Sequence, residues 1–447
     1  MTERLKSIFL VFLICLSLFL SYEIWFSGER ELNLKTSQVV NLSDLPVKLL
    51  VPEKVVINFG NRSHTVIEKD ETVRSVLYEF QRVLNEYQAQ KLKRSIEIAD
   101  QRKWETMDGV PSIHLSYTGP IDGSIFSFVL GMNKGIFNNF SIKDFYIVVG
   151  ESPLIYFRDE LSGRIYKLDL GPIKSNFAYL MNQVKNQKPL NYMTSSELGF
   201  EDYVEGNVLI PVELGGFDLY KLKEVRSFNI GSEVEVKNLQ KKYMREVSKT
   251  IKEADGSLVF TDGQKTLKVY PDGSLEFADS STVKENSDFV SAYDQAVKFM
   301  VLHGDYSENL YLMGTGISRE QDDTEYIFYF GLKYNHVPVI TKDGSAIIEA
   351  RVLRNKVVYY KSLNKRFQPL NIFNERVLHP ISAIDKALSL NNSNSKEKRR
   401  VLDIKISYYY RASDGACIPV WIVKTPGNTI LIDAFKGDVV LDGLGKS

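Results

Sequence analysis

An apolar run near the start of the chain, residues 8–26, constrains the rest of it. It reads "IFLVFLICLSLFLSYEIWF", and its strongest polar interruption is Glu23. A helix needs roughly 20 apolar residues to cross a bilayer, whereas a cleaved signal has a shorter apolar core and a small-residue cleavage site. The run continues through Trp25 and Phe26 with no Ala-x-Ala after it. We therefore expect a retained anchor, and a cleaved signal with an unusual site is the alternative.

The charges before the run predict its orientation. Arg4 and Lys6 precede it, and basic residues favour the cytoplasmic side. Residues 1–28 are thus predicted to be a short cytoplasmic stub and a transmembrane anchor. We expect a single-pass protein of the cell membrane with its N-terminus cytoplasmic and the bulk of the chain extracellular.

One face of the predicted anchor is a candidate interface with a transmembrane partner. Helical spacing places five residues on this face: Ile8, Phe12, Leu16, Phe19 and Glu23. Glu23 has two interpretations. It either reaches water at the outer interface, or it pairs with a polar group on a neighbouring helix, since ionisable residues inside membrane spans are often functional.

Length and composition exclude several classes of protein. The 447 residues are too many for a single core. Lys plus Arg total 56 and Asp plus Glu total 56, so the formal net charge is zero and gives no electrostatic attraction to nucleic acid.

The two cysteines are far apart in the sequence. Cys15 lies in the predicted anchor and Cys417 lies near the C-terminus, so we expect no disulfide between them. An exported protein without disulfides argues against a eukaryotic secretory origin and fits the outer face of a bacterium. Cys417 is expected to be a small apolar side chain.

The remaining chain is predicted to be α+β, with antiparallel sheets and packed helices in several extracellular domains. Residues 29–50 are polar and are interpreted as a stalk. The expected domains are an N-terminal α+β domain at 29–205, a β-rich middle domain at 206–285 and a C-terminal α+β domain at 286–447. In the first domain, apolar periodicity predicts a helix over 71–94 with Asp70 as a cap, and another that starts near Ser175. The runs 55–59, 125–130, 145–150 and 154–159 are predicted strands.

Three Asp-Gly pairs mark the middle domain, which also has a predicted helix at 236–248. The pairs are at 255–256, 262–263 and 272–273. Paired acids and glycines can indicate calcium, but a calcium loop needs several oxygen ligands at close spacing. Asp-Gly between two runs of alternating apolar and polar residues strongly indicates a β-hairpin. Turns are the favoured interpretation, and metal is the alternative.

The C-terminal domain is predicted to repeat a unit of one helix followed by an antiparallel sheet, at about 286–365 and 377–440. Pro338-Val339 lies nineteen residues before Val357-Val358, and Pro419-Val420 lies twenty before Val439-Val440. This spacing predicts that the two Pro-Val pairs are equivalent positions in the two copies.

The chain has no recognisable catalytic signature. Its five histidines fall in no zinc spacing, and it has neither G-x-S-x-G, nor a P-loop, nor G-x-G-x-x-G after a strand. We expect no enzyme activity, no catalytic or metal-binding residues and no cofactor. An extracellular ligand-binding protein or a cell-wall enzyme is the alternative.

Several segments, taken in order, resemble the YycH family, the accessory proteins of the WalK/WalR (YycG/YycF) two-component system of low-GC Gram-positive bacteria. They are the basic stub with its single apolar helix, "VPEKVVINFG" with the helix after it, and "VFTDGQKTLKVYPDGSLEF". The last segments, "GLKYNHVPVI", "HPISAIDKALSL" and "IPVWIV...ILIDAFKGDVV", also resemble the sister family YycI.

The resemblance implies a membrane-anchored regulator with two partners, the sensor histidine kinase WalK and a YycI-like protein. Such a protein tunes kinase output for cell-wall metabolism. A small inner stub predicts action through the anchor or the outer domains. The sequence leaves open the sign of regulation, whether a ligand is sensed, which outer face contacts partners, and the oligomeric state.

Overall fold

The computed structural model describes residues 45–447, except 68, 91–95, 133–134, 214–218, 226–227, 245–248, 282–286, 321–322, 343, 345, 371–375, 391–399 and 444–447. The chain divides into two compact units, Met1–Leu45 and Pro46–Ser447, and the second is described here. The predicted anchor and its candidate face lie outside the described residues. Within the described part, no helix is long and apolar enough to cross a membrane.

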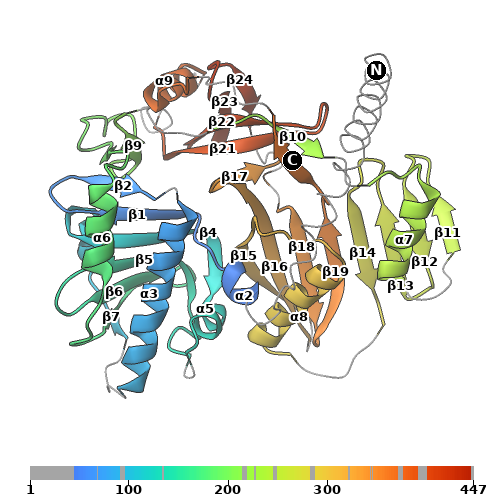
Figure 1. Cartoon of the computed structure of the whole chain (residues 1–447), viewed down its shortest axis with the longest axis horizontal. Coiled ribbons are helices and arrows are strands. Elements are labelled where there is room, and N and C mark those ends of the chain that lie inside the picture. Colours follow the sequence, from blue (N-terminus) through green and yellow to red (C-terminus); the bar gives the residue numbers. More distant parts are fainter. Residues whose placement is uncertain are drawn as a thin grey trace, which may run out of the picture. The chain divides into compact units, whose positions relative to one another are not determined.

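The first sheet has nine strands in the order β3-β7-β6-β5-β4-β1-β2-β8-β9 (Figure 1). All of its pairs are antiparallel. Its strands are β1 (Lys54–Asn58), β2 (His64–Val66), β3 (Glu97–Ile98), β4 (Ser112–Asp122), β5 (Ser141–Val148), β6 (Leu154–Asp159), β7 (Ile165–Asp169), β8 (Tyr192–Thr194) and β9 (Leu209–Pro211).

An aromatic cluster joins helices to one face of this sheet. Phe145 of β5 lies 5.5 Å from Phe80 and 5.0 Å from Phe126, measured between ring centroids. The helices of this region are α2 (Leu45–Leu49), α3 (Asp70–Ala89), α4 (Gln101–Glu105), η2 (Met107–Gly109), α5 (Gly123–Val129) and α6 (Phe177–Asn186). Because edge-to-face aromatic pairs add to area burial, this cluster fixes α3 and α5 on the sheet.

The prediction of a strand at 125–130 is wrong, because this run forms α5. The Asp122 side chain caps the helix by accepting a bond from the Ser124 amide at 2.9 Å. A Cβ on Gly123 would lie 1.8 Å from the carbonyl oxygen of Phe137, so only glycine fits there. The helix is buried on most sides, and a short, fully apolar run has no periodicity that separates helix from strand.

Three smaller expectations also need correction. Residues 45–49 of the predicted stalk form α2, and Leu49 is fully buried. Asp70 is the first residue of α3 rather than its cap, and Lys69 before it makes no capping bond. The next predicted helix, α6, begins at Phe177 after Asn176.

The second sheet has fifteen strands. Its main path is β11-β12-β13-β14-β19-β18-β16-β17-β21-β22-β10-β20, and β15, β23 and β24 branch from it. The strands are β10 (Leu222–Val225), β11 (Lys249–Lys252), β12 (Leu258–Thr261), β13 (Lys265–Val269), β14 (Leu275–Asp279), β15 (Leu310–Glu320), β16 (Asp323–Tyr334), β17 (Val337–Ile340), β18 (Ile348–Leu353), β19 (Lys356–Ser362), β20 (Arg366–Pro369), β21 (Asp403–Arg411), β22 (Ala416–Thr425), β23 (Asn428–Asp433) and β24 (Val439–Asp442). The helices of this region are α7 (Glu233–Tyr243), α8 (Phe289–Leu302) and α9 (Pro380–Leu390).

The Asp-Gly turns are confirmed. They connect β11 to β12, β12 to β13 and β13 to β14 as antiparallel hairpins. Each glycine has a positive φ, and each aspartate side chain accepts backbone amide bonds within its own turn. The carboxylates therefore serve turn geometry. The sheet continues from β14 to β19 across the predicted boundary at 285, and the domain boundaries themselves stay predictions.

The C-terminal region contains two meanders with the same strand order, each preceded by a helix. After α8 the order is β15-β16-β18-β19, and after α9 it is β21-β22-β23-β24. The predicted equivalence of the Pro-Val pairs is wrong. Pro338 lies in β17, an extra strand of the first copy that pairs with β16, whereas Pro419 lies in β22, which corresponds to β16 in this order.

Candidate functional site

The outward surface of α3 and α6 is the best-defined candidate site. The two helices lie side by side in front of the nine-stranded sheet (Figure 1). Each buries an apolar stripe against it: Val73, Val76, Phe80, Val83, Leu84 and Tyr87 of α3, and Phe177, Met181 and Val184 of α6. The stripes leave the opposite face of each helix to polar and aromatic side chains.

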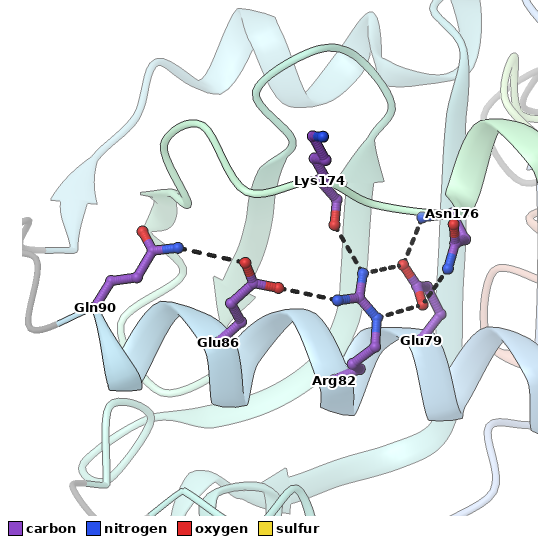
Figure 2. Close-up of polar contacts among 6 residues, drawn as sticks. All are labelled: Glu79, Arg82, Glu86, Gln90, Lys174 and Asn176. Carbon is purple, nitrogen blue, oxygen red and sulfur yellow. Dashed lines mark hydrogen bonds and ion pairs between the residues drawn. The ribbon is translucent and has the colours of Figure 1, made fainter.

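Arg82 is the centre of a polar network on this surface (Figure 2). Its Nε and Nη2 donate to the two carboxylate oxygens of Glu79 at 2.9 and 2.8 Å. Nη1 donates to Glu86 at 2.9 Å, and Nη2 also donates to the carbonyl oxygen of Lys174 at 2.7 Å. The fork of the guanidinium matches a carboxylate in this bidentate geometry, so the position of Arg82 is fixed from two helical turns and a neighbouring loop.

Glu79 connects this network to the start of α6. One of its oxygens accepts a bond from the backbone amide of Asn176 at 2.5 Å, and the other accepts from the Asn176 side chain at 3.4 Å. The Glu79 side chain is only 5% exposed. Burial would raise the pKa of this carboxyl, but the bonds from Arg82 and Asn176 outweigh it and lower the pKa. Glu79 is therefore a charged clamp that holds α6 against α3.

A shallow groove of ≈560 Å³ lies between the two helices. Arg74, Ser75 and Tyr78 line it from α3, and Tyr179 and Leu180 line it from α6. Tyr78 is 70% exposed and Tyr179 is 62% exposed. Only one other tyrosine of the described residues, at position 203, is exposed to a similar degree. Two of the three most exposed tyrosines therefore share one groove.

The groove carries an unmatched positive charge. Glu79 and Arg82 at its base neutralise each other. The Arg74 side chain is exposed and makes no hydrogen bond or ion pair with any other described residue, although Asp70 and Glu71 lie one turn before it on α3. Arg74 and Tyr78 are four residues apart, so their side chains are neighbours on the helix surface. The geometry provides an aromatic and cationic surface for binding.

Three of the described histidines each pair with a carboxylate, and His64 also contacts the side chain of Asn58 at 2.8 Å. His64 lies 3.2 Å from Glu197, and His114 lies 2.9 Å from Asp144. His336 pairs with Asp70 at 3.0 Å, and burial lowers the pKa of this histidine. In the part of the chain that the structure describes, no three His, Cys, Asp or Glu side chains come together as metal ligands. Cys417 is buried on β22, and burial raises the pKa of its thiol.

A second cavity of ≈200 Å³ lies in the C-terminal region and includes Asp305. This carboxylate accepts bonds from the hydroxyls of Tyr360 and Tyr243 at 2.7 and 3.2 Å. Burial raises the pKa of Asp305, although the two hydroxyls act in the opposite direction. Among the residues that the structure describes, no histidine or cysteine lines this cavity.

The predicted site and the observed one do not overlap. Ile8, Phe12, Leu16, Phe19 and Glu23 lie outside the described residues, so the anchor face stays a prediction. Sequence reasoning missed the groove between α3 and α6. The available signal was a tyrosine on the polar side of each helix, beside the Glu79, Arg82 and Glu86 spacing of three and four residues.

Comparison with known proteins places this surface in a recognised domain. A family model described as "YycH protein, N-terminal domain" matches residues 3–189, which include α3 and α6. The structure "Crystal Structure of YycH from Bacillus subtilis" is similar over 86% of this chain and 96% of its own chain, with a TM-score of 0.56 and 14% identity. Residues 3–189 are thus similar to the N-terminal domain of the YycH family, and the fold is similar to that of YycH over most of the chain.

At this sequence identity the likeness to the Bacillus subtilis structure shows a common fold. No curated protein matches the chain. The match to the YycH N-terminal domain indicates an accessory, regulatory role in WalK/WalR signalling in general terms.

Proposed function

We propose that this protein is a membrane-anchored extracellular regulator of a two-component system. In this proposal it associates with a WalK-type sensor histidine kinase and with a YycI-like protein, and it modulates signalling that controls cell-wall metabolism. The single observation that supports it is the match of the YycH N-terminal domain over residues 3–189. This region includes both the apolar run and the groove between α3 and α6.

The proposed mechanism uses the anchor. Helix pairing in lipid relies on packing and on occasional polar contacts, each worth on the order of 1 kcal/mol. Several such contacts along Ile8, Phe12, Leu16, Phe19 and Glu23 could shift a kinase equilibrium severalfold, since about 1.4 kcal/mol corresponds to a factor of ten. A partner that binds one kinase state better than the other shifts the population toward it. The outer domains would then position the anchor.

A span exchange tests this mechanism. Replacing residues 8–26 with an unrelated apolar span should keep export and folding but lose regulation, read from a reporter promoter of the two-component system. Glu23→Gln, the matched single change, should have a smaller effect. Full regulation by the exchanged protein would contradict the mechanism.

A protease experiment tests the membrane orientation. Protease added to intact protoplasts should digest residues 30–447, whereas release of a shortened protein into the medium would contradict the retained anchor.

The alternative is an extracellular ligand-binding protein or cell-wall enzyme, and the cavity at Asp305 is the observation that favours it. Asp305 lines this cavity, and its carboxylate accepts bonds from two tyrosine hydroxyls. Purified residues 30–447 should be incubated with cell wall and the products measured. Turnover that Asp305→Asn abolishes, in a variant that stays folded, would favour the enzyme. The regulatory proposal expects no turnover.

A further inference from the structure

We infer that the groove between α3 and α6 is a docking site for a protein segment that carries a carboxylate beside an aromatic or other apolar side chain. The inference deepens the proposed function and rests on it, because a regulator of a kinase acts through contact with a partner. It concerns the outer domain, not the anchor, and it names the chemistry of the segment that binds.

The groove is rigid before any partner arrives. Arg82 is fixed by Glu79, Glu86 and the carbonyl of Lys174, and Glu79 also fixes the first turn of α6. The two walls of the groove therefore cannot move apart without breaking the charge-assisted bonds of the buried Glu79 carboxylate. A surface that is already ordered avoids much of the entropy cost of binding.

The exposed side chains are those that dominate binding energy in protein interfaces. Tyrosine and arginine are enriched at such hot spots, and tyrosine provides a large contact area with few rotatable bonds. Tyr78 and Tyr179 stand on opposite walls of the groove and are mostly exposed. A partner segment that enters the groove would therefore meet an exposed tyrosine on each wall.

The charge of the groove selects the partner. Glu79 and Arg82 satisfy each other, which leaves Arg74 as the lining charge without a partner among the described residues. A carboxylate on the incoming segment could form a bidentate pair with it. Because Arg74 is one turn from Tyr78, the carboxylate and the inserted apolar side chain must lie close together on the partner.

Photo-crosslinking in cells that make the full-length protein tests the inference. A benzoylphenylalanine is placed at Ser75 or Tyr179 in the groove, or at Tyr203, which is 60% exposed elsewhere on the surface. We expect the two groove positions to capture the same polypeptide, identified by mass spectrometry, with an Asp or Glu next to the captured residue. The control position should not capture it.

Charge exchange then decides whether Arg74 selects the partner. Arg74→Glu should lower the crosslink yield at least tenfold, and Arg102→Glu, a change at another exposed arginine, should not. Reversing the acidic residue of the captured segment to Arg should restore the yield with Arg74→Glu. An unchanged yield with Arg74→Glu, capture of a second copy of this chain, or capture of lipid would overturn the inference.

A reporter measured in the same cells separates this inference from the proposed function. If deleting the whole protein leaves two-component output unchanged, the proposed function fails. If deletion changes output but Arg74→Glu combined with Tyr78→Ala leaves both output and crosslinking intact, only the docking site fails.

Discussion

Helices α3 and α8 each cover one face of a sheet, yet they are held in different ways. α8 begins with a capping box, in which Asp288 accepts a bond from the Ser291 amide at 2.7 Å. Its inner face packs Phe289 and Tyr293 on Phe328. α3 has no side-chain cap and instead carries the Arg82 network on its outer side. The polar network of α3 lies on the side of the helix that faces α6, so it holds the two helices together and keeps the surface between them in place.

The largest expected loss of stability tests the aromatic packing that holds α8 on its sheet. Phe328 is fully buried and contacts two aromatic side chains of α8. Phe328→Ala should lower the free energy of unfolding by about 3–5 kcal/mol, because it leaves a cavity under the helix. Urea unfolding followed by circular dichroism measures this. A loss below about 1 kcal/mol would show that α8 does not depend on this packing.

The next effect concerns the clamp on α3. Glu79→Gln should cost about 1–3 kcal/mol, because it weakens charge-assisted bonds to Arg82 and Asn176. Glu86→Gln is the matched control and should cost little, since the Glu86 side chain is 39% exposed. If Glu79→Gln and Glu86→Gln lower the free energy of unfolding equally, Glu79 stabilises the fold no more than an exposed ion pair does.

Acid provides a separate test of the same clamp. Folding lowers the pKa of Glu79, so its stabilising contribution is complete above the ordinary carboxyl pKa of about 4.3. That contribution is lost as pH falls through the folded value. The stability difference between the protein and Glu79→Gln should therefore shrink between pH 6 and pH 3. A constant difference over this range would contradict a charged clamp.

A smaller effect is expected at the cap of α8. Asp288→Ala removes the bond to the Ser291 amide and should cost about 1 kcal/mol. Asp294→Ala, which removes an exposed pair with Lys298 on the same helix, is the control and should cost less. Thermal unfolding of both variants under one buffer condition compares them, and the reverse order would contradict the role of the cap.

The smallest effect on stability should accompany a large effect on binding. Tyr78→Ser changes a side chain that is 70% exposed, so the free energy of unfolding should change by less than about 0.5 kcal/mol. The crosslink from position 179 should nevertheless fall severalfold. Substantial destabilisation by Tyr78→Ser would assign the tyrosine to the fold and not to a surface.

The sequence predicts features whose cause is local. The periodicity of α3 and the Asp-Gly hairpins depend on neighbouring residues, and both are present. Run 125–130 was misassigned because its helix is specified by the Asp122 cap and by the close approach of Phe137 to Gly123, which lies fourteen positions away. The groove could not be predicted, because Glu79 and Asn176 meet only after the sheet has formed. The anchor face stays a prediction.

The extra strand β17 has a consequence for the order of folding. It forms a two-residue hairpin with β16, with positive φ at Asn335 and His336, and it pairs in parallel with β21 at Val339–Tyr408. Each meander is built from neighbouring strands and can form early. Their junction must close a loop of about seventy residues, and such non-local pairing slows folding. The two meanders should therefore acquire protection from hydrogen exchange before the β17–β21 pair does, which makes this junction a late step in forming the large sheet.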